Sequence, residues 1–166
     1  MILHREPVKM KIAHVRSGGL AATLLGAIMV LASPSAAQAQ EAVEYLDPPP
    51  GMPFSAATRV GDILYLSGEI GTLPDGSLPE GMEAQTRQTM DNLARTMARY
   101  GVGFEDVFKC LVMLTDMSKW ADFNAIYIEY FEPDRLPARS ALGANGLALG
   151  ALVEVECWAY APKDGE

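Results

Sequence analysis

The chain has 166 residues, with 21 Asp and Glu against 13 Lys and Arg, which gives a net charge of −8. An acidic surface repels nucleic acid and anionic lipid, so we expect neither as a partner. Both histidines, His4 and His14, lie near the N-terminus. A domain built from the later residues therefore has no imidazole, which excludes Ser-His and Cys-His nucleophile systems and His-ligated zinc.

Residues 1–39 have the pattern of a secretory signal peptide. A basic segment ends at Arg16, an uncharged run covers residues 19–32, and Ala37-Gln38-Ala39 is a small-x-small cleavage pattern. The uncharged run is shorter than the roughly 20 residues that a membrane-spanning helix needs, and an uncleaved anchor is the alternative. Cleavage after Ala39 leaves residues 40–166, a single periplasmic or secreted domain with no stable membrane association. It has 9 basic and 20 acidic residues, a net charge of −11.

In chain order, hydrophobic periodicity and turn signals predict the order βββαβαββ. The predicted strands cover residues 41–46, 55–59, 63–70, 107–113, 138–144 and 153–161. The predicted helices cover residues 82–100 and 117–131, with Ser118 as the expected cap of the second. Gly61-Asp62 is a turn signal that joins the second and third strands as a hairpin. This order predicts an α/β (α+β) fold, in which a mixed sheet carries both helices on one face.

The last predicted strand has two different faces. One face is apolar and is expected to pack under the helices, and it carries Val153, Val155, Cys157, Ala159 and Ala161. The other face carries Glu154, Glu156, Trp158 and Tyr160. A domain of this length has no further layer to cover these large aromatic side chains. We therefore expect another subunit to cover the second face.

The cysteines Cys110 and Cys157 each lie in an apolar, strand-like run and have no CxxC spacing. Because free Cys is among the most buried residue types, we interpret both as buried structural thiols. An exported chain meets oxidising conditions, so a disulfide between them is the alternative if their strands are neighbours.

Arg139 and Glu154 are the candidate functional residues late in the chain. Pro137 disfavours helix in the residue before it, so Arg139 is held near a strand start rather than on a mobile loop. A guanidinium suits two-point binding of a ligand carboxylate. The alternative for Arg139 is an ion pair with acids of its own protein. The alternative for Glu154 is a structural acid paired with Arg139 or Lys109.

Several fragments have the order and spacing of one known family. They are Pro53-Phe54-Ser55-Ala56-Ala57, Val60-Gly61-Asp62, Leu66-Ser67-Gly68-Glu69-Ile70, Gln85-Thr86 with Asn92-Leu93, Asp106-Val107, Asp122-Phe123-Asn124 with Tyr127 and Phe131, Pro137-Ala138-Arg139-Ser140 and Val153-Glu154-Val155-Glu156. Together they resemble the RidA (YjgF) enamine/imine deaminase family over residues 41–161. The resemblance implies a chorismate-mutase-like fold and a homotrimer with a central β-barrel and pockets between subunits.

The resemblance also implies roles for individual residues. Arg139 matches the arginine that binds the substrate carboxylate, and Glu154 matches the glutamate that holds and activates water. Ser67 and Gly68 match the segment whose backbone lines the pocket. Asn124 matches a polar helix residue near the pocket.

Two pocket positions depart from the family. Phe54 stands where well-known deaminating members have a tyrosine, so one hydroxyl is lost. Ala141 replaces a frequent cysteine, which argues against a thiol nucleophile. The leader is a third departure, because the usual substrates of the family arise in the cytosol.

The implied reaction is hydrolysis of small 2-imino or enamine acids to 2-oxo acids and ammonia, and it needs no cofactor or metal. Arg139 would hold the substrate carboxylate and Glu154 would orient water and transfer protons. The alternative is a non-catalytic periplasmic trimer that binds a carboxylate metabolite or protects other proteins. Ribonuclease activity is disfavoured by the negative charge and the absence of His from the domain.

Overall fold

The computed structural model describes residues 42–163. The predicted signal peptide and its cleavage site lie outside the described residues. The strands are β1 (Glu44–Leu46), β2 (Ala57–Val60), β3 (Ile63–Leu66), β4 (Glu69–Ile70), β5 (Val107–Leu114), β6 (Ala138–Gly143) and β7 (Val153–Tyr160). The α-helices in this part of the chain are α1 (Gly81–Ala98) and α2 (Trp120–Tyr127).

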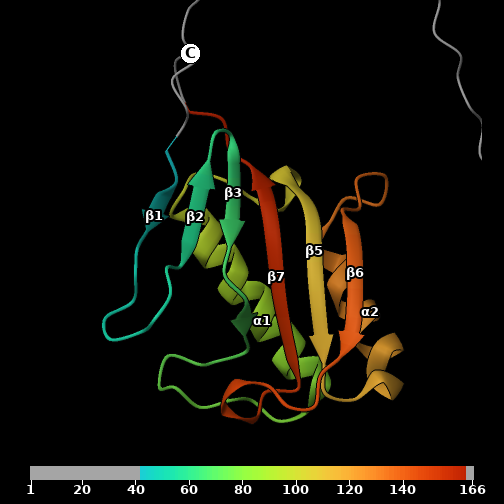
Figure 1. Ribbon diagram of the computed structural model, residues 1–166. Helices are drawn as coiled ribbons and strands as arrows, with labels where there is room; N and C mark the ends of the chain where they lie inside the picture. The colour runs from blue at the N-terminus through green and yellow to red at the C-terminus, as the bar shows by residue number, and fades with distance from the viewer. Residues whose placement is uncertain (1–41, 164–166) are drawn as a thin grey trace, which may run out of the picture. The chain divides into compact units, whose positions relative to one another are not determined.

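The strands form one mixed sheet in the order β1-β2-β3-β7-β5-β6, and β4 also pairs with β7. Strands β5 and β6 are parallel, joined through α2, and the other pairs are antiparallel. Figure 1 shows both helices on one face of this sheet. The predicted fold class and position of the helices are therefore confirmed, and the element order agrees except that the third predicted strand forms both β3 and β4.

The predicted hairpin forms between β2 and β3. Val60 pairs with Ile63, so Gly61 and Asp62 make a two-residue turn. Gly61 has a φ of +55°, a conformation that glycine adopts without the steric cost that other residues incur. The hairpin positions β3, which leads directly into Ser67 and Gly68, two of the predicted site residues.

The core lies between the helices and the sheet. Met90, Leu93 and Met97 recur three and four residues apart on α1 and are fully buried, as are Val153 and Val155 of β7. Burial of a side chain of this size contributes roughly 1.5–3 kcal/mol. The prediction that one face of the last strand packs under the helices is confirmed.

Polar side chains of α1 fix the strands that carry the site. Asn92 donates through Nδ2 to the carbonyl oxygens of Ile70 (2.8 Å) and Thr72 (3.0 Å). Gln85 accepts from the backbone N–H of Leu152 at 2.8 Å, just before β7 begins. Both α1 side chains are nearly buried, so these bonds hold β4 and the start of β7 against the helix.

Most strand and helix ends shift by a few residues, and three further features differ from the predictions. The strand predicted over residues 63–70 is interrupted at Ser67 and Gly68. The second helix is α-helical only from Trp120 to Tyr127, with a 3₁₀ turn at each end. Ser118 does not cap it, because Asp116 accepts a hydrogen bond from the Ser118 N–H at 2.8 Å.

The interpretation of the cysteines as free thiols is wrong. Cys110 and Cys157 form a disulfide between β5 and β7, where they are direct cross-strand partners. Both residues are fully buried on the helix side of the sheet. The bond joins two central strands and closes a sequence separation of 47 residues.

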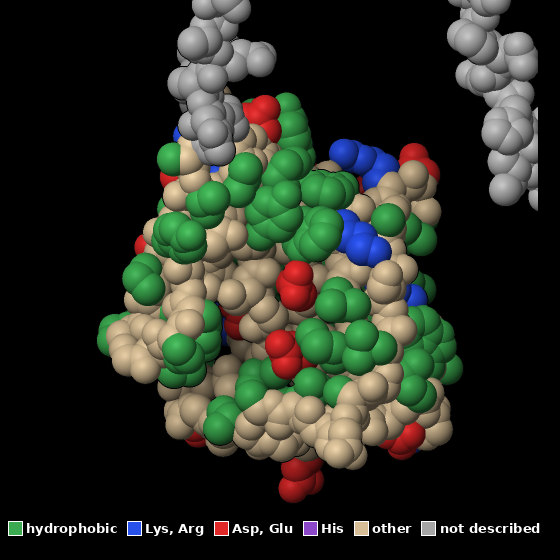
Figure 2. Space-filling view, in the orientation of Figure 1, with side chains coloured by type: hydrophobic (Ala, Val, Ile, Leu, Met, Phe, Trp, Pro, Cys, Tyr) green, Lys and Arg blue, Asp and Glu red, His purple; other side chains and the backbone are tan. Residues whose placement is uncertain are grey.

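No layer among residues 42–163 covers the second face of the sheet. Figure 2 shows this face, with many hydrophobic side chains and with acidic groups near its middle. Trp158 contacts Tyr65 (5.3 Å between ring centroids) and Phe108 (6.4 Å), and Phe108 and Tyr160 remain exposed. In the described part of the chain, no helix has the length and apolar character needed to span a membrane.

Candidate active site

A β-bulge at Ser67 and Gly68 shapes one part of the candidate site. Tyr65 pairs with Trp158 and Glu69 pairs with Val155. From the first pair to the second, the chain advances four residues from Tyr65 to Glu69 but only three along β7. The segment from Tyr65 to Glu69 therefore contains one extra residue. Such a bulge bends the strand and re-aims its neighbours. It is the reason that the predicted continuous strand divides into β3 and β4.

Gly68 makes room for the carboxylate of Glu154. A Cβ atom built on Gly68 would overlap with Oε1 of Glu154, and it would lie 3.0 Å from the carboxylate carbon. Only a glycine fits against this carboxylate without moving it. The Ser67 hydroxyl donates to the carbonyl of Ser55 at 2.7 Å and so holds the bulge in place. The structure therefore brings Ser67, Gly68 and Glu154 together.

Glu154 is half-buried on the second face of the sheet. Burial raises the pKa of its carboxyl, and the charge of Glu156 on the same face raises it further. Within residues 42–163, Glu154 makes no ion pair. Lys109 instead donates to the hydroxyl of Ser140 at 3.0 Å. Within one copy of the described chain, Glu154 is therefore not an acid paired with Arg139 or Lys109.

Arg139 lies against aromatic rings of α2. Its guanidinium carbon is 4.6 Å from the ring centre of Tyr127, 4.7 Å from that of Trp120 and 5.7 Å from that of Phe123. Arginine is favourable over such faces, which hold it without neutralising its charge. Arg139 has no carboxylate partner among the described residues, so the alternative of an internal ion pair is also wrong.

Unpaired polar atoms lie on the same helix as these rings. Oδ1 of Asn124 and the hydroxyl of Tyr127 are buried and have no hydrogen-bond partner. Asn124 and Tyr127 are three residues apart, so they share one face of α2. Burial raises the pKa of Tyr127 to about 12, and the nearby charge of Arg139 opposes that rise. Buried polar groups without partners are uncommon, and they fit a surface that a ligand or another chain completes.

The predicted site residues form two separate groups. Cys110 and Val112 face the helices and pair with Arg139 and Ala141, so these two residues of β6 lie on the helix side of the sheet. Glu154 lies on the opposite side. Arg139 pairs with Cys110 of β5, which in turn pairs with Cys157 of β7, so Arg139 and Cys157 are two strands apart at the same level of the sheet. Glu154 lies three residues from Cys157 along β7. Strand spacings place the Cα atoms of Arg139 and Glu154 about 14 Å apart.

A cavity of about 680 Å³ opens beside the bulge. Its lining includes Phe54, Ser67, Gly68 and Glu156. Three of these are predicted site residues, whereas Glu156 is one that the sequence analysis did not assign to the site. The alternation of buried and less buried residues along β7 puts Glu154 and Glu156 on one face, and this pattern in the sequence indicates that Glu156 lies near the site. The aromatic rings that hold Arg139 were likewise predicted only as the apolar face of a helix.

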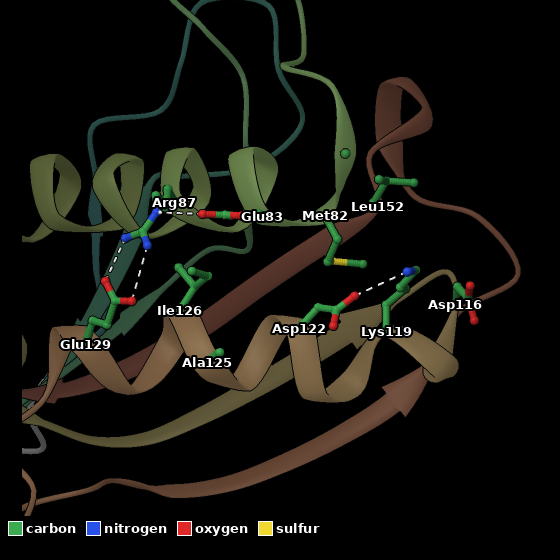
Figure 3. Close-up of a pocket in the computed structure, with 11 residues that line it drawn as sticks. Met82, Glu83, Arg87, Asp116, Lys119, Asp122, Ala125, Ile126, Glu129 and Leu152 are labelled. Atoms are coloured by element: carbon green, nitrogen blue, oxygen red, sulfur yellow. Dashed lines mark hydrogen bonds and ion pairs between the residues drawn. The ribbon is translucent and has the colours of Figure 1, made fainter.

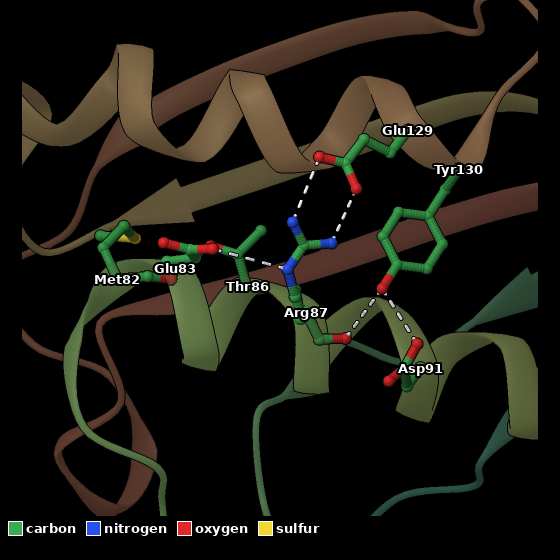
Figure 4. Close-up of polar contacts among 7 residues, drawn as sticks. All are labelled: Met82, Glu83, Thr86, Arg87, Asp91, Glu129 and Tyr130. Carbon is green, nitrogen blue, oxygen red and sulfur yellow. Dashed lines mark hydrogen bonds and ion pairs between the residues drawn. The ribbon is translucent and has the colours of Figure 1, made fainter.

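A larger cavity, about 770 Å³, lies elsewhere, between α1 and α2 (Figure 3). It contains none of the predicted site residues, and its central charges are already paired. Arg87 forms a two-point ion pair with Glu129, with distances of 2.7 and 3.2 Å, and Lys119 pairs with Asp122. Figure 4 shows that Tyr130 also bridges the helices by donating to Asp91. The contacts of Arg87 and Tyr130 hold α1 against the turn that follows α2, so we assign this cavity no role in the reaction.

Comparisons with known proteins agree with this fold. Residues 45–161 match the family model described as Endoribonuclease L-PSP. A RutC family protein of Sulfurisphaera tokodaii is 38% identical over 110 residues, covering 65% of this chain and 87% of that protein. The 2-iminobutanoate/2-iminopropanoate deaminase of Mus musculus is 35% identical over 106 residues, covering 63% and 78%.

A solved structure agrees as well. The Rid family protein YyfA of Yersinia pestis has a TM-score of 0.67 and 34% identity, covering 72% of this chain and 99% of that one. The family match spans most of the chain and includes every predicted site residue. The chain therefore belongs to the RidA (YjgF) family, in which relatives of about 35% identity are named as imine deaminases.

Proposed function

We propose that the protein hydrolyses small, reactive 2-imino or enamine acids to 2-oxo acids and ammonia. The observation that carries this proposal is a pair of oppositely charged groups, neither of which has an ion-pair partner in the described chain. They are the guanidinium of Arg139 and the half-buried carboxylate of Glu154, whose pKa is raised. The deaminase name of the mouse relative supports the same chemistry.

The reaction needs a site for a carboxylate and a group that moves protons. In a 2-imino acid the carboxylate is next to the C=N carbon, so Arg139 would hold the former and stabilise negative charge near the latter. Glu154 would accept a proton from water as the water oxygen bonds to the C=N carbon, and would pass that proton to the nitrogen to give a carbinolamine. The same carboxylate would then accept the proton of the new hydroxyl and deliver it to the nitrogen, so that the C=O bond forms as the C–N bond breaks and ammonia leaves. A pKa raised toward neutrality suits a group that acts both as base and as acid.

We further propose that the active site forms between chains of a chorismate-mutase-like homotrimer with a central β-barrel. Arg139 and Glu154 of one chain are too far apart to touch one small substrate. A second copy would bring Arg139 and Ala141 of its β6 edge, and Asn124 of its α2, to the bulge and Glu154 of the first. The uncovered aromatic side chains of the second face and the unpaired Oδ1 of Asn124 support such an assembly.

The proposed location is the periplasm or the outside of the cell, after cleavage of a signal peptide behind Ala39. The disulfide between Cys110 and Cys157 supports this location, because disulfides persist in oxidising compartments. Expression of the full chain followed by intact-mass analysis of the periplasmic fraction tests it. A chain that begins at Met1 and stays in the membrane would contradict the proposal.

A second candidate is a non-catalytic trimer that binds a carboxylate metabolite or protects other proteins. Phe54 favours this reading, because it lines the cavity but offers no hydroxyl at a position where the family resemblance implies a tyrosine. In this case Arg139 would still hold a carboxylate, but no imine would be consumed.

A coupled assay separates the two candidates. An amino-acid oxidase generates 2-imino acids in the presence of the protein, and release of ammonia is followed above the uncatalysed rate. Arg139→Ala should lose turnover and also 2-oxo acid binding in calorimetry, since a charge-assisted contact contributes roughly 1.5–3 kcal/mol. Arg135→Ala is the control, because the side chain of Arg135 donates only to the carbonyl of Glu105 among the described residues. Binding without any turnover by the wild type would favour the second candidate.

A further inference from the structure

The cavity beside the bulge joins the proposed reacting centre to a second carboxylate. Gly68 lines the cavity and also touches the carboxylate of Glu154. Glu156 lines the same cavity and lies two residues from Glu154 on the same face of β7. A substrate with its C=N carbon at Glu154 would therefore have room to extend its side chain past Gly68 toward Glu156.

The Glu156 carboxylate is oriented but not neutralised. Its Oε1 accepts a hydrogen bond from Nε1 of Trp158 at 2.9 Å, which leaves Oε2 available. Glu156 is half-buried and makes no ion pair within residues 42–163, and no Lys or Arg of the same copy lines the cavity. Arg139 of a second copy would hold the substrate carboxylate at the Glu154 end of the site, so it leaves Glu156 available for the side chain. A carboxylate oxygen without a partner in this position can accept a charge-assisted hydrogen bond from a cation that enters the cavity.

Aromatic rings surround the path to this carboxylate. Tyr45, Phe54 and Tyr65 line the cavity, and their π faces attract cations. A neutral alkyl side chain would contact the same rings but leave the carboxylate of Glu156 without a partner. An acidic side chain would be repelled by Glu156 and Glu154 together.

We propose that this cavity selects 2-imino acids whose side chain ends in a cation, an ammonium or a guanidinium, with Glu156 as the specificity-determining residue. This inference rests on the proposed deaminase function and names its substrate class. An enzyme that oxidises basic amino acids must then supply the substrate. The negative charge of the chain would favour the approach of such cations.

A matched pair of substrates tests the inference. Arginine and citrulline have side chains of the same length, but that of arginine ends in a guanidinium and that of citrulline in a neutral ureido group. An amino-acid oxidase converts each to its 2-imino acid, and ammonia release above background gives kcat/KM for the protein. The wild type should prefer the arginine-derived imine by on the order of 10-fold or more, as expected for a hydrogen bond to a charged group.

The Glu156→Gln variant separates recognition from effects on Glu154. The substitution changes the surroundings of Glu154 equally for both substrates, so the ratio of the two kcat/KM values is the readout. This ratio should fall to near one in Glu156→Gln and stay at the wild-type value in Glu132→Gln, a change at an exposed acid outside the cavity.

Two results would overturn the inference while leaving the deaminase proposal intact. One is hydrolysis of both imines by the wild type with equal kcat/KM, and the other is a preference that survives in Glu156→Gln. A wild type that releases no ammonia from either imine would instead reject the proposed function, and this inference with it.

Discussion

Arg139 and Glu154 lie on opposite faces of one sheet, on strands that β5 separates. Each is without an ion-pair partner in the described chain, and each has further site residues beside it. A single copy thus carries the two halves of the proposed site on opposite faces, where they cannot contact the same small substrate. This arrangement makes a test of the assembly possible with two inactive proteins.

We predict that Arg139→Ala and Glu154→Gln, each inactive alone, regain activity when their chains are mixed by co-refolding. A shared site needs Arg139 from one chain and Glu154 from its neighbour. Random mixing in equal amounts places both intact residues in about one quarter of the sites of a closed ring. Ammonia release should therefore recover to about a quarter of the wild-type value.

The control for that experiment mixes each variant with itself, where no intact site can form. Light scattering on the same samples should give a mass near three chains. Mixed samples that stay inactive, although they contain both chains in one assembly, would place the whole site within one chain or elsewhere.

We predict that Glu154→Gln lowers turnover on the order of 10²-fold or more but does not lower the melting temperature near neutral pH. The raised pKa means that the folded state disfavours the charged carboxylate of Glu154. The charged carboxylate therefore destabilises the folded state at pH values above the pKa of Glu154 in the folded chain. This effect is lost as the pH falls below the ordinary carboxyl range, where Glu154 is protonated in both the folded and the unfolded chain.

Thermal melts of the wild type and Glu154→Gln across this pH range check the prediction. The difference in melting temperature should favour the variant most at neutral pH and vanish in acid. A variant that is less stable than the wild type at neutral pH would mean that the charge of Glu154 is compensated in the assembly.

The sequence allowed the sheet, both helices and the apolar face of β7 to be predicted, because hydrophobic periodicity depends only on neighbouring positions. It could not locate the bulge at Ser67 and Gly68. A bulge is defined by pairing with a distant strand, here from Tyr65 to Trp158 and from Glu69 to Val155. The separation of the site into two groups depends on the same long-range register.

We predict that Gly68→Ala loses activity with little loss of stability, whereas Gly71→Ala mainly loses stability. A Cβ on Gly68 would meet the movable carboxylate of Glu154 and displace it. A Cβ on Gly71 would lie 2.7 Å from the backbone oxygen of Gln85 in α1, which cannot move without shifting the helix. Ammonia release and thermal melts on both variants separate the two outcomes. Equal losses of stability in the two variants would show that the new methyl group at residue 68 distorts the backbone of the bulge instead of displacing the side chain of Glu154.

We predict that the disulfide between Cys110 and Cys157 stabilises the fold without taking part in the reaction. Closing a separation of 47 residues restricts the unfolded chain, which contributes about 4 kcal/mol in the chain-entropy model. Cys110→Ala combined with Cys157→Ala should lower the unfolding free energy by about that amount in denaturant titrations. The wild type titrated in reducing agent should approach the double variant.

The same double variant should keep its kcat/KM below its melting temperature, because both sulfur atoms are buried on the helix side, away from Glu154. Thiol labelling of the unfolded, unreduced wild type is the control, and it should find no reactive cysteine. Full labelling would show that the thiols are free in the protein. Loss of activity in a folded double variant would mean that the bond holds the neighbouring Arg139 in position, since Cys110 pairs with Arg139 across β5 and β6.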